Sequence, residues 1–424
     1  MKILFQEGKK VNEECTNALS LINSLQKKRE YLHSLNMDDL IQFFHQVSHH
    51  WKENKMLEQI TGGSLKHLAQ FIEQKQLVAM LDFALRGDYR ILDRFVDLQQ
   101  EKYIYHCQPR GLIVHWLSGN VPLLGLYSII QAMLTKNVSL VKASEKAYEE
   151  LVLLLDSMSA VNTENIQGSE LLSTVAVVLV DRNDLQNQQL LSESADVRVV
   201  WGGQEAVETI SSLRKSIFCE DIIYGPKYSY GVVDRESLQK MEEITTRLAF
   251  DVCTFDQYAC SSPHTLFVEG SESEAEQFGQ KLAEKMRFVA EKMLPKGNEE
   301  PKKRFDILAV RAKYSMLGKI FHSPNTDWTV VYTTEEGLAQ ACFSRVIVVK
   351  PINGIREVTK YNDRKKQTLG SAITSENREK IIDDITLHGI DRCPRFGDMT
   401  LYESPWDGFF AIDRMVRWVG LYKM

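Results

Sequence analysis

Short apolar runs alternate with longer amphipathic segments along most of this chain. Over residues 40–51 and 64–85 apolar positions recur every three or four residues, which predicts helices in the first hundred residues. From Tyr103 onward the apolar runs are shorter and predict buried strands. These predicted strands are 111–117, 138–142, 174–180 and 197–201, with helices predicted at 123–134, 145–155, 184–191 and 204–213. Strands separated by helices of about ten residues indicate βαβ units and a mostly parallel sheet.

A second alternating region begins after Tyr224-Gly225-Pro226. We therefore predict an α/β protein with two α/β domains and a boundary near Gly225. Because ligands of parallel sheets bind beyond the carboxyl ends of the strands, the loops 118–122, 142–145 and 201–205 are candidate phosphate-binding loops. The second region has predicted strands at 230–233, 265–268, 328–332 and 346–351, helices at 237–249 and 272–293, and a charged surface loop at 295–304.

Composition and charge exclude several classes of protein. The 424 residues suffice for two or three domains, and a net charge of −6 gives no basic footprint for nucleic acid. The seven cysteines are odd in number and form no Cys-x-x-Cys pair, which argues against a disulfide framework and a structural zinc site and favours the cytoplasm. The apolar segment 121–134 is too short to span a bilayer, and the N-terminus does not have the pattern of a signal peptide. His45 and His49 have the spacing of a metal pair, but no acidic ligand accompanies them, so we interpret them as a polar helix face.

Cys260 is the candidate nucleophile. It lies among small residues, in Tyr258-Ala259-Cys260-Ser261-Ser262, just before the predicted strand 265–268. Small neighbours leave room for a carbonyl group, which a thiolate can attack. The alternative is a packed cysteine, since free cysteines are often buried as small apolar residues. His264 follows four residues later, and the predicted strand points it away, so we interpret it as structural.

Four segments in order resemble the aldehyde dehydrogenase superfamily. They are Gly119-Asn120-Val121-Pro122, Lys142-Ala143-Ser144-Glu145, Trp201-Gly202-Gly203-Gln204 and Gln257-Tyr258-Ala259-Cys260. More narrowly, residues 109–111, 255–264 and 389–408 resemble the acyl-CoA reductase family that includes the LuxC-type subunit of bacterial fatty acid reductase. The resemblance covers about residues 100–424. It implies an aldehyde dehydrogenase-like fold with two Rossmann-like α/β domains, a helical N-terminal segment and an oligomerisation arm.

Two departures from the superfamily pattern bear on the reaction. Superfamily members that oxidise aldehydes carry a glutamate general base, whereas the corresponding segment here is Ile222-Ile223-Tyr224-Gly225. Without a base to activate water, hydrolysis of an acyl-enzyme is slow, which favours reduction of an acyl thioester over oxidation of an aldehyde. The Glu-x-Phe-Gly motif, which holds the nicotinamide ribose in the superfamily, has no clear counterpart around Cys342-Phe343-Ser344-Arg345.

The resemblance gives each candidate residue a role. Cys260 is the nucleophile, and Asn120 donates to the oxyanion, although asparagine before a helix is also a common N-cap. Lys142, Ser144 and Glu145 hold the adenosine ribose, although an acidic residue near a helix start is common without a ligand. Gly202 and Gly203 let the backbone approach a pyrophosphate; a plain strand-to-helix turn is the alternative. No metal ligand is expected.

The implied function is the reduction of a fatty acyl-CoA or acyl-protein thioester to an aldehyde, with NADPH as cofactor and NADH as the alternative. The alternatives are an acyltransferase or acyl carrier that uses the same cysteine, and an aldehyde dehydrogenase running in the oxidising direction. An acyl-activating synthetase subunit and a homo-oligomer are implied as partners. The expected domains are a helical N-terminus with the dinucleotide-binding domain over 1–224, the catalytic domain over 225–395, and a tail over 396–424 that returns to the cofactor domain or an oligomer interface.

Overall fold

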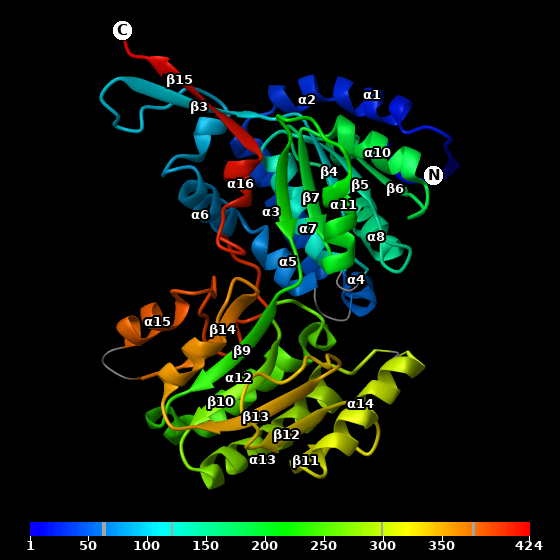
Figure 1. Ribbon diagram of the computed structural model, residues 1–424. Helices are drawn as coiled ribbons and strands as arrows, with labels where there is room; N and C mark the ends of the chain where they lie inside the picture. The colour runs from blue at the N-terminus through cyan, green and yellow to red at the C-terminus, as the bar shows by residue number, and fades with distance from the viewer. Residues whose placement is uncertain (62–64, 120–121, 298–299, 375–377) are drawn as a thin grey trace. The chain divides into compact units, whose positions relative to one another are not determined.

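Two compact units make up the chain. The computed structural model describes residues 1–424 apart from 62–64, 120–121, 298–299 and 375–377 (Figure 1). Unit 1 comprises Met1–Gly225 and Tyr402–Met424, and unit 2 comprises Pro226–Leu401. The chain therefore leaves unit 1 once and returns to it with its C-terminal segment.

The main sheet of unit 1 is doubly wound. Its strand order is β2-β1-β6-β5-β4-β7-β8, and the five strands from β6 to β8 run parallel. From β4 the chain moves outward through β5 and β6, then returns to the other side of β4 for β7 and β8. The order therefore reverses between β4 and β7, where ligands of such sheets bind at the carboxyl edge. The strands are β1 (Lys2–Gln6), β2 (Lys9–Glu14), β4 (Leu112–Trp116), β5 (Val138–Lys142), β6 (Val175–Leu179), β7 (Val197–Trp201) and β8 (Glu220–Tyr224).

Helices of unit 1 account for the amphipathic segments of the sequence. The predicted helix over 64–85 is two helices, which Ile72 and Glu73 separate. The predicted helix over 145–155 begins later, at Tyr148. The helices are α1 (Leu19–Lys27), α2 (Arg29–Ser34), α3 (Met37–Glu53), α4 (Lys55–Ile60), α5 (Leu65–Phe71), α6 (Gln74–Ala84), η1 (Tyr89–Leu92), α7 (Pro122–Leu134), α8 (Tyr148–Ser159), α9 (Gly168–Leu172), α10 (Leu185–Ser194), α11 (Gln204–Ser212) and α16 (Ala411–Arg414).

A hairpin at the N-terminus corrects the prediction that the first hundred residues are helical. Strands β1 and β2 pair antiparallel, and β1 extends the main sheet by pairing antiparallel with β6. The turn between them uses Glu7 and Gly8, both with positive φ (48° and 70°), which suits a two-residue hairpin. The apolar run Ile3-Leu4-Phe5 is buried. A run of three apolar residues is too short to indicate a strand by itself, so the helical pattern that follows determined the prediction.

A two-stranded sheet protrudes from unit 1 (Figure 1). It pairs β3 (Tyr103–Pro109) with β15 (Val416–Tyr422) in antiparallel register. The C-terminal segment thus pairs with the strand that precedes β4.

His115 is a fully buried titratable group of β4. Its Nδ1 and Nε2 lie 3.1 Å and 3.2 Å from the hydroxyl oxygens of Ser128 and Ser139. Burial lowers the pKa of His115 to about 3. Below about pH 6.5 the unfolded chain binds a proton at this residue that the folded protein does not bind. The folded state is therefore destabilised progressively as the pH falls from about 6.5 towards 3.

We expect the free energy of unfolding to fall by up to about 1.4 kcal/mol for each pH unit below this point through His115 alone. Urea denaturation of the native protein and His115→Asn at about pH 7 and about pH 5 measures this contribution, because the variant lacks it. Equal losses of stability in the two proteins between these pH values would show that His115 binds its proton in the folded state as well.

Unit 2 is a second three-layer α/β structure. Its sheet has the order β11-β12-β13-β10-β9-β14, all parallel except β11. One apolar cluster joins α12 and α13 to the sheet, and another joins η5 and α15 to it. The elements are β9 (Tyr228–Val233), η2 (Glu236–Lys240), α12 (Met241–Cys253), η3 (Thr254–Gln257), β10 (Pro263–Glu269), α13 (Glu272–Phe288), η4 (Val289–Met293), α14 (Pro301–Tyr314), β11 (Gly318–His322), β12 (Thr329–Thr333), β13 (Val346–Ile352), η5 (Ile355–Tyr361), β14 (Lys366–Ala372) and α15 (Arg378–Thr386).

Helix α14 corrects the prediction of a surface loop over 295–304. The helix begins at Pro301, a residue favoured at the first helical position because its missing N–H is not needed there. Lys302, Lys303 and Arg304 form its first turn. Their charge suggested a loop, whereas they form the start of a helix that is buried through Ile307 and Tyr314.

Candidate active site

Cys260 lies on the loop formed by η3 and the residues between η3 and β10, and the η3 part of this loop is strained. Phe255, Asp256 and Gln257 all have positive φ (53°, 49° and 64°), a conformation that costs free energy in residues other than glycine and persists only when the surroundings impose it. The Cys260 side chain itself is neither buried nor fully exposed. Contacts with the rest of unit 2 must therefore hold the backbone of this loop in its strained conformation.

Gln257 ties the loop to two strands from a fully buried position. Its Nε2 donates to the carbonyl oxygens of Pro263 (2.7 Å) and Val346 (2.8 Å), and its Oε1 accepts from the Val346 N–H (2.8 Å). The Gln257 side-chain amide thus hydrogen-bonds to both backbone groups of Val346, as the backbone of a neighbouring strand would. The left-handed turn at this residue directs the side chain inward.

Asp256 joins the loop to a second left-handed turn, Phe343-Ser344-Arg345, with φ of 60°, 58° and 64°. The Arg345 guanidinium donates through Nε to Asp256 Oδ1 (2.7 Å), and the Ser344 N–H donates to the Asp256 carbonyl (3.0 Å). A second guanidinium nitrogen donates to the Leu294 carbonyl (2.7 Å). The Arg345 side chain is only 2% exposed and that of Asp256 is 28% exposed, so this ion pair is partly shielded from water.

Ser229 on β9 fixes the Cys260 peptide itself. Its hydroxyl donates to the Cys260 carbonyl oxygen (2.7 Å) and accepts from the Thr368 N–H (3.2 Å) on β14. Together with Gln257 and Arg345, Ser229 holds the cysteine loop against β9, β13 and β14. Sequence reasoning missed Ser229 and Arg345 because each acts through contacts distant in the chain.

Aromatic rings pack beside the loop. The rings of Tyr258 and Phe343 are stacked at 5.7 Å, and the His264 ring meets Phe343 edge-on at 5.0 Å. His264 is buried, and burial lowers its pKa to about 4, so the ring is neutral at physiological pH. A neutral, enclosed ring agrees with the interpretation of His264 as a structural residue.

The other cysteines differ from Cys260 in their surroundings. Burial raises the pKa of Cys107 and Cys253 to about 12 and that of Cys219 and Cys393 to about 11, which suppresses their thiolates. Within unit 2, Cys260 and Cys393 are half-exposed, whereas Cys253 and Cys342 are buried. Exposure therefore favours Cys260 over Cys253 and Cys342, and the raised pKa of Cys393 disfavours that residue as the nucleophile.

The candidate ribose site lies at the carboxyl end of β5 in unit 1. Lys142 ends the strand half-buried, and burial lowers its pKa against the opposing effect of the Glu145 and Asp181 charges. The loop after β4 approaches closely: a Cβ on Gly119 would lie 2.6 Å from the Ser144 hydroxyl oxygen. A half-buried ammonium beside an exposed carboxylate and a hydroxyl is suited to a polyhydroxylated or phosphorylated ligand.

Gly202 and Gly203 link β7 to α11 at the switch point of the sheet. A Cβ on Gly202 would lie 3.0 Å from the Ala206 Cβ, and one on Gly203 would meet nothing within 4 Å. The space before the N-terminus of α11 is therefore open on the side of Gly203. Backbone N–H groups at such a terminus suit an anionic group, so the residues present fit a dinucleotide pyrophosphate.

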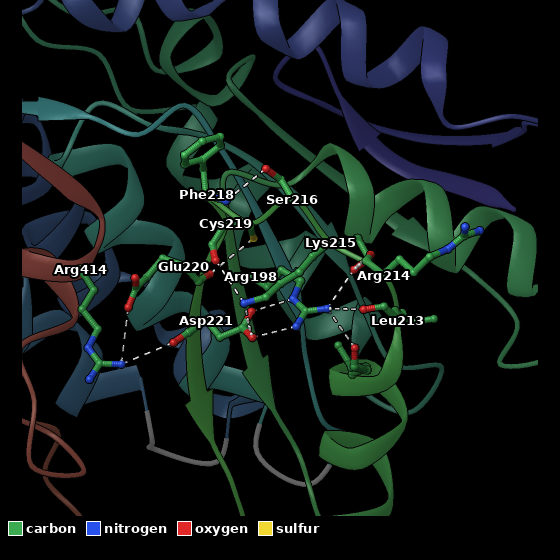
Figure 2. A network of polar contacts seen from close by, with 12 residues as sticks. Arg198, Leu213, Arg214, Lys215, Ser216, Phe218, Cys219, Glu220, Asp221 and Arg414 are labelled. Atoms are coloured by element: carbon green, nitrogen blue, oxygen red, sulfur yellow. Dashed lines mark hydrogen bonds and ion pairs between the residues drawn. The ribbon is translucent and has the colours of Figure 1, made fainter.

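A polar network holds the far end of α11 (Figure 2). Arg198 on β7 is buried and donates through Nε and Nη2 to the two carboxylate oxygens of Asp221 on β8 (2.7 Å and 2.8 Å). Its Nη1 donates to the carbonyl oxygens of Ile210 (3.0 Å) and Leu213 (3.3 Å) at the end of the helix. Because Ile210 is the only buried residue of α11, we infer that polar contacts contribute much of the attachment of this helix to the sheet.

The carboxyl end of β8 is apolar. The resemblance aligns this segment with the one that carries the general base in superfamily members that oxidise aldehydes. Ile222 and Tyr224 are buried, and the Tyr224 ring stacks on Trp201 at 3.8 Å. The carboxylates of β8 lie at its amino end, where Asp221 binds Arg198 and Glu220 lies 3.7 Å from Arg414.

The predicted oxyanion donor Asn120 lies outside the described residues, so its role stays a prediction. Across the described ranges, no group of three or more His, Cys, Asp and Glu side chains is arranged to hold a metal ion. In the same ranges, no helix combines the length and apolar content that a membrane crossing requires.

Comparison with known proteins identifies the family. Residues 16–418 match the model of the acyl-CoA reductase (LuxC) family. The long-chain acyl-protein thioester reductase of Vibrio harveyi is 26% identical over 99% of this chain and 89% of its own length, and that of Photobacterium phosphoreum is 24% identical over 93% and 82%. Both relatives thus match over more than four fifths of their own length.

Solved structures of aldehyde dehydrogenases share the fold. Aldehyde dehydrogenase 21 of Physcomitrella patens, solved with succinate, has a TM-score of 0.71 at 11% identity and covers 99% of this chain and 98% of its own. Lactaldehyde dehydrogenase of Escherichia coli has a TM-score of 0.68 at 12% identity, with 100% and 98% covered. The predicted aldehyde dehydrogenase-like fold is therefore confirmed. The chain is an enzyme that belongs to the acyl-CoA reductase (LuxC) family.

Proposed function

We propose that this protein reduces a long-chain fatty acyl thioester to the aldehyde through an S-acyl intermediate on Cys260, with NADPH as the hydride donor. The observation that carries the proposal is the fixed loop around the half-exposed Cys260, in a chain of the acyl-CoA reductase family. A strained loop held from three strands is the kind of support that a positioned nucleophile requires.

The first half of the proposed reaction is acyl transfer. The Cys260 thiolate attacks the thioester carbonyl, the new carbon–sulfur bond forms, and the donor thiol leaves. The backbone N–H of Cys260 and the side-chain amide of Asn120 donate to the developing oxyanion. The product is a thioester of the protein, so little free energy separates it from the substrate, and the acyl carbon stays electrophilic.

The second half is reduction without hydrolysis. The segment Ile222-Ile223-Tyr224-Gly225, which corresponds to the general-base motif in the resemblance, carries no carboxylate to activate water, so we expect the S-acyl group to persist. A reduced nicotinamide cofactor, when bound, supplies a hydride to the acyl carbon. The thiohemiacetal anion on Cys260 then collapses, releasing the aldehyde and restoring the thiolate.

Unit 1 is the proposed dinucleotide-binding domain and unit 2 the proposed catalytic domain. Lys142, Ser144 and Glu145 would hold the adenosine ribose, and Gly202 and Gly203 would admit the pyrophosphate. The Glu145 carboxylate suits ribose hydroxyls and repels a 2′-phosphate, so NADH is the alternative to NADPH. We further propose that the enzyme works in the cytoplasm, as a homo-oligomer, beside an acyl-activating synthetase that supplies acyl-CoA or an acyl-protein.

Replacing Arg198 by lysine is expected to weaken cofactor binding selectively. Lysine cannot bridge Asp221 and the far end of α11 at the same time, so the helix that begins beside Gly203 is held less firmly against β7 and β8. Loss of one hydrogen bond of a charged group corresponds to an increase of at least ~10-fold in the dissociation constant for NADPH. Titration of NADPH fluorescence measures this dissociation constant. The control is Arg214→Lys, because the side chain of Arg214 is exposed. Equal affinities of Arg198→Lys and the native protein would contradict a positioning role for Arg198.

Acyl transfer without reduction is the second candidate, because Arg345 occupies the region of the nicotinamide-ribose motif and is bound to Asp256. The test incubates the purified protein with saturated acyl-CoAs of increasing length, with and without NADPH, and traps aldehyde as a hydrazone. The proposal expects aldehyde equal in amount to the NADPH consumed. Acyl exchange between thiols without NADPH consumption would establish the transferase, and rapid oxidation of added aldehyde would establish the dehydrogenase.

A further inference from the structure

Helix α14 exposes an apolar face to solvent. The side chains of Phe305 and Leu308 are 71% and 53% exposed, and that of Met316, just after the helix, is 86% exposed. Ala309 and Ala312 are exposed as well. At about 100° per residue, the four helical positions fall within a stripe roughly 100° wide, the width of one amphipathic face.

This stripe lies opposite the face that attaches the helix to unit 2. The attached face buries Ile307, Arg311 and Tyr314, and Arg311 donates to Thr329 Oγ1 (2.9 Å) and the Trp328 carbonyl (3.1 Å). The helix therefore packs fully without its exposed stripe. We call the exposed residues Phe305, Leu308, Ala309, Ala312 and Met316 the α14 stripe.

Positive charges flank the α14 stripe on both sides. The same helical geometry places Lys302 along one edge of the stripe and Arg304 along the other. Lys313 also lies on the edge of Lys302, where its Nζ is 3.6 Å from the Glu335 carboxylate. Residues 301–319 contain six lysines and arginines and one acidic residue, Asp306, in a chain whose net charge is −6. Of the six, Arg311 is buried and Lys319 forms an ion pair with Glu276, so Lys302 and Arg304 carry most of the charge beside the stripe. Lys303 lies outside this edge, since it donates to the Cys342 carbonyl (3.2 Å) and to Asp306 (3.1 Å).

We propose that the α14 stripe binds the surface of a bilayer that contains anionic phospholipid. An apolar stripe with basic residues on both edges is the pattern of a helix that lies in the membrane interface. Its apolar side chains would enter the acyl boundary, while the long basic side chains reach the phosphate groups. The charge of the edges selects an anionic surface, and this inference does not depend on the proposed function.

The test uses the full-length protein and sedimentation with vesicles. Vesicles of phosphatidylcholine mixed with an equal amount of phosphatidylglycerol are expected to bind the protein, and vesicles of phosphatidylcholine alone to bind it at least ~10-fold more weakly. Raising the salt concentration should release the bound protein. Equal binding to both vesicles, or binding to neither, would overturn the proposal.

Matched variants assign the binding to the helix. The pair Phe305→Ser and Leu308→Ser, and separately the pair Lys302→Glu and Arg304→Glu, should each weaken binding to the mixed vesicles at least ~10-fold. The control is the pair Ile217→Ser and Phe218→Ser, since these residues are 90% and 82% exposed on a loop of unit 1.

Thermal unfolding verifies that each variant is folded. The two variant pairs act through different contacts, so if one pair does not fold, the other still tests the proposal. Equal loss with the control pair would overturn the assignment. The proposal would also be overturned if the same residues bound an acidic polypeptide, or a second copy of this chain, while the protein bound no vesicles.

Discussion

Cys260→Ala is expected to form no acyl adduct and to lose NADPH-dependent reduction by about 10⁴-fold or more. The proposed reaction passes through a covalent bond to this sulfur, and removal of a nucleophile typically costs rate factors of this size or larger. Intact mass spectrometry after incubation with acyl-CoA, without NADPH, measures the adduct directly. In the native protein the added mass should equal one acyl group, and NADPH should remove it.

The matched control for this experiment is Cys393→Ala. Cys393 is half-exposed and lies in the same unit, but burial raises its pKa to about 11, which keeps it a thiol. We expect this variant to form the adduct like the native protein. An adduct that survives in Cys260→Ala and maps to Cys393 or Cys15 would place the nucleophile elsewhere and refute the proposed mechanism.

The parallel core of unit 1 could be predicted from the sequence because its strands are buried on both faces. Runs such as Val138–Lys142 and Val197–Trp201 therefore appear as nearly continuous apolar segments, and both have the predicted bounds. The hairpin β1–β2 could not be found in this way. Strand β2 is mostly exposed and its pattern is polar, so only pairing with β1 shows it to be a strand.

The site was predictable only where its residues are neighbours in the chain. Cys260 stands among small residues, and Gly202-Gly203 follows a strand, so each carries a local signal. Ser229 and Arg345 carry none, because they contact the cysteine loop from β9 and from the turn before β13. The lack of a clear Glu-x-Phe-Gly counterpart around residues 342–345 was visible in the sequence, but the ion pair of Arg345 with Asp256 required the structure.

Replacing Arg345 by methionine is expected to destabilise the folded protein by about 3 kcal/mol. The substitution leaves the Asp256 carboxylate without its cationic partner. Because 28% of the Asp256 side chain is exposed, the loss in free energy of unfolding should lie at the lower end of the range for broken buried ion pairs. Chemical denaturation measures the difference. The control Arg356→Met breaks the exposed pair with Asp384 and should change stability by at most about 1 kcal/mol.

The same Arg345→Met variant is expected to form the S-acyl adduct at least ~10²-fold more slowly, because misplacement of a reacting group by about 1 Å has effects of this size. The rate is measured below the unfolding transition of the variant. Asp256→Asn keeps the hydrogen bond to Arg345 but removes the charge, and should retain more of the rate. A purely structural ion pair would lower stability in Arg345→Met and leave the acylation rate of the folded fraction unchanged. That result would show that Gln257 and Ser229 suffice to position Cys260, since their hydrogen bonds to Val346 and to the Cys260 carbonyl do not involve Arg345.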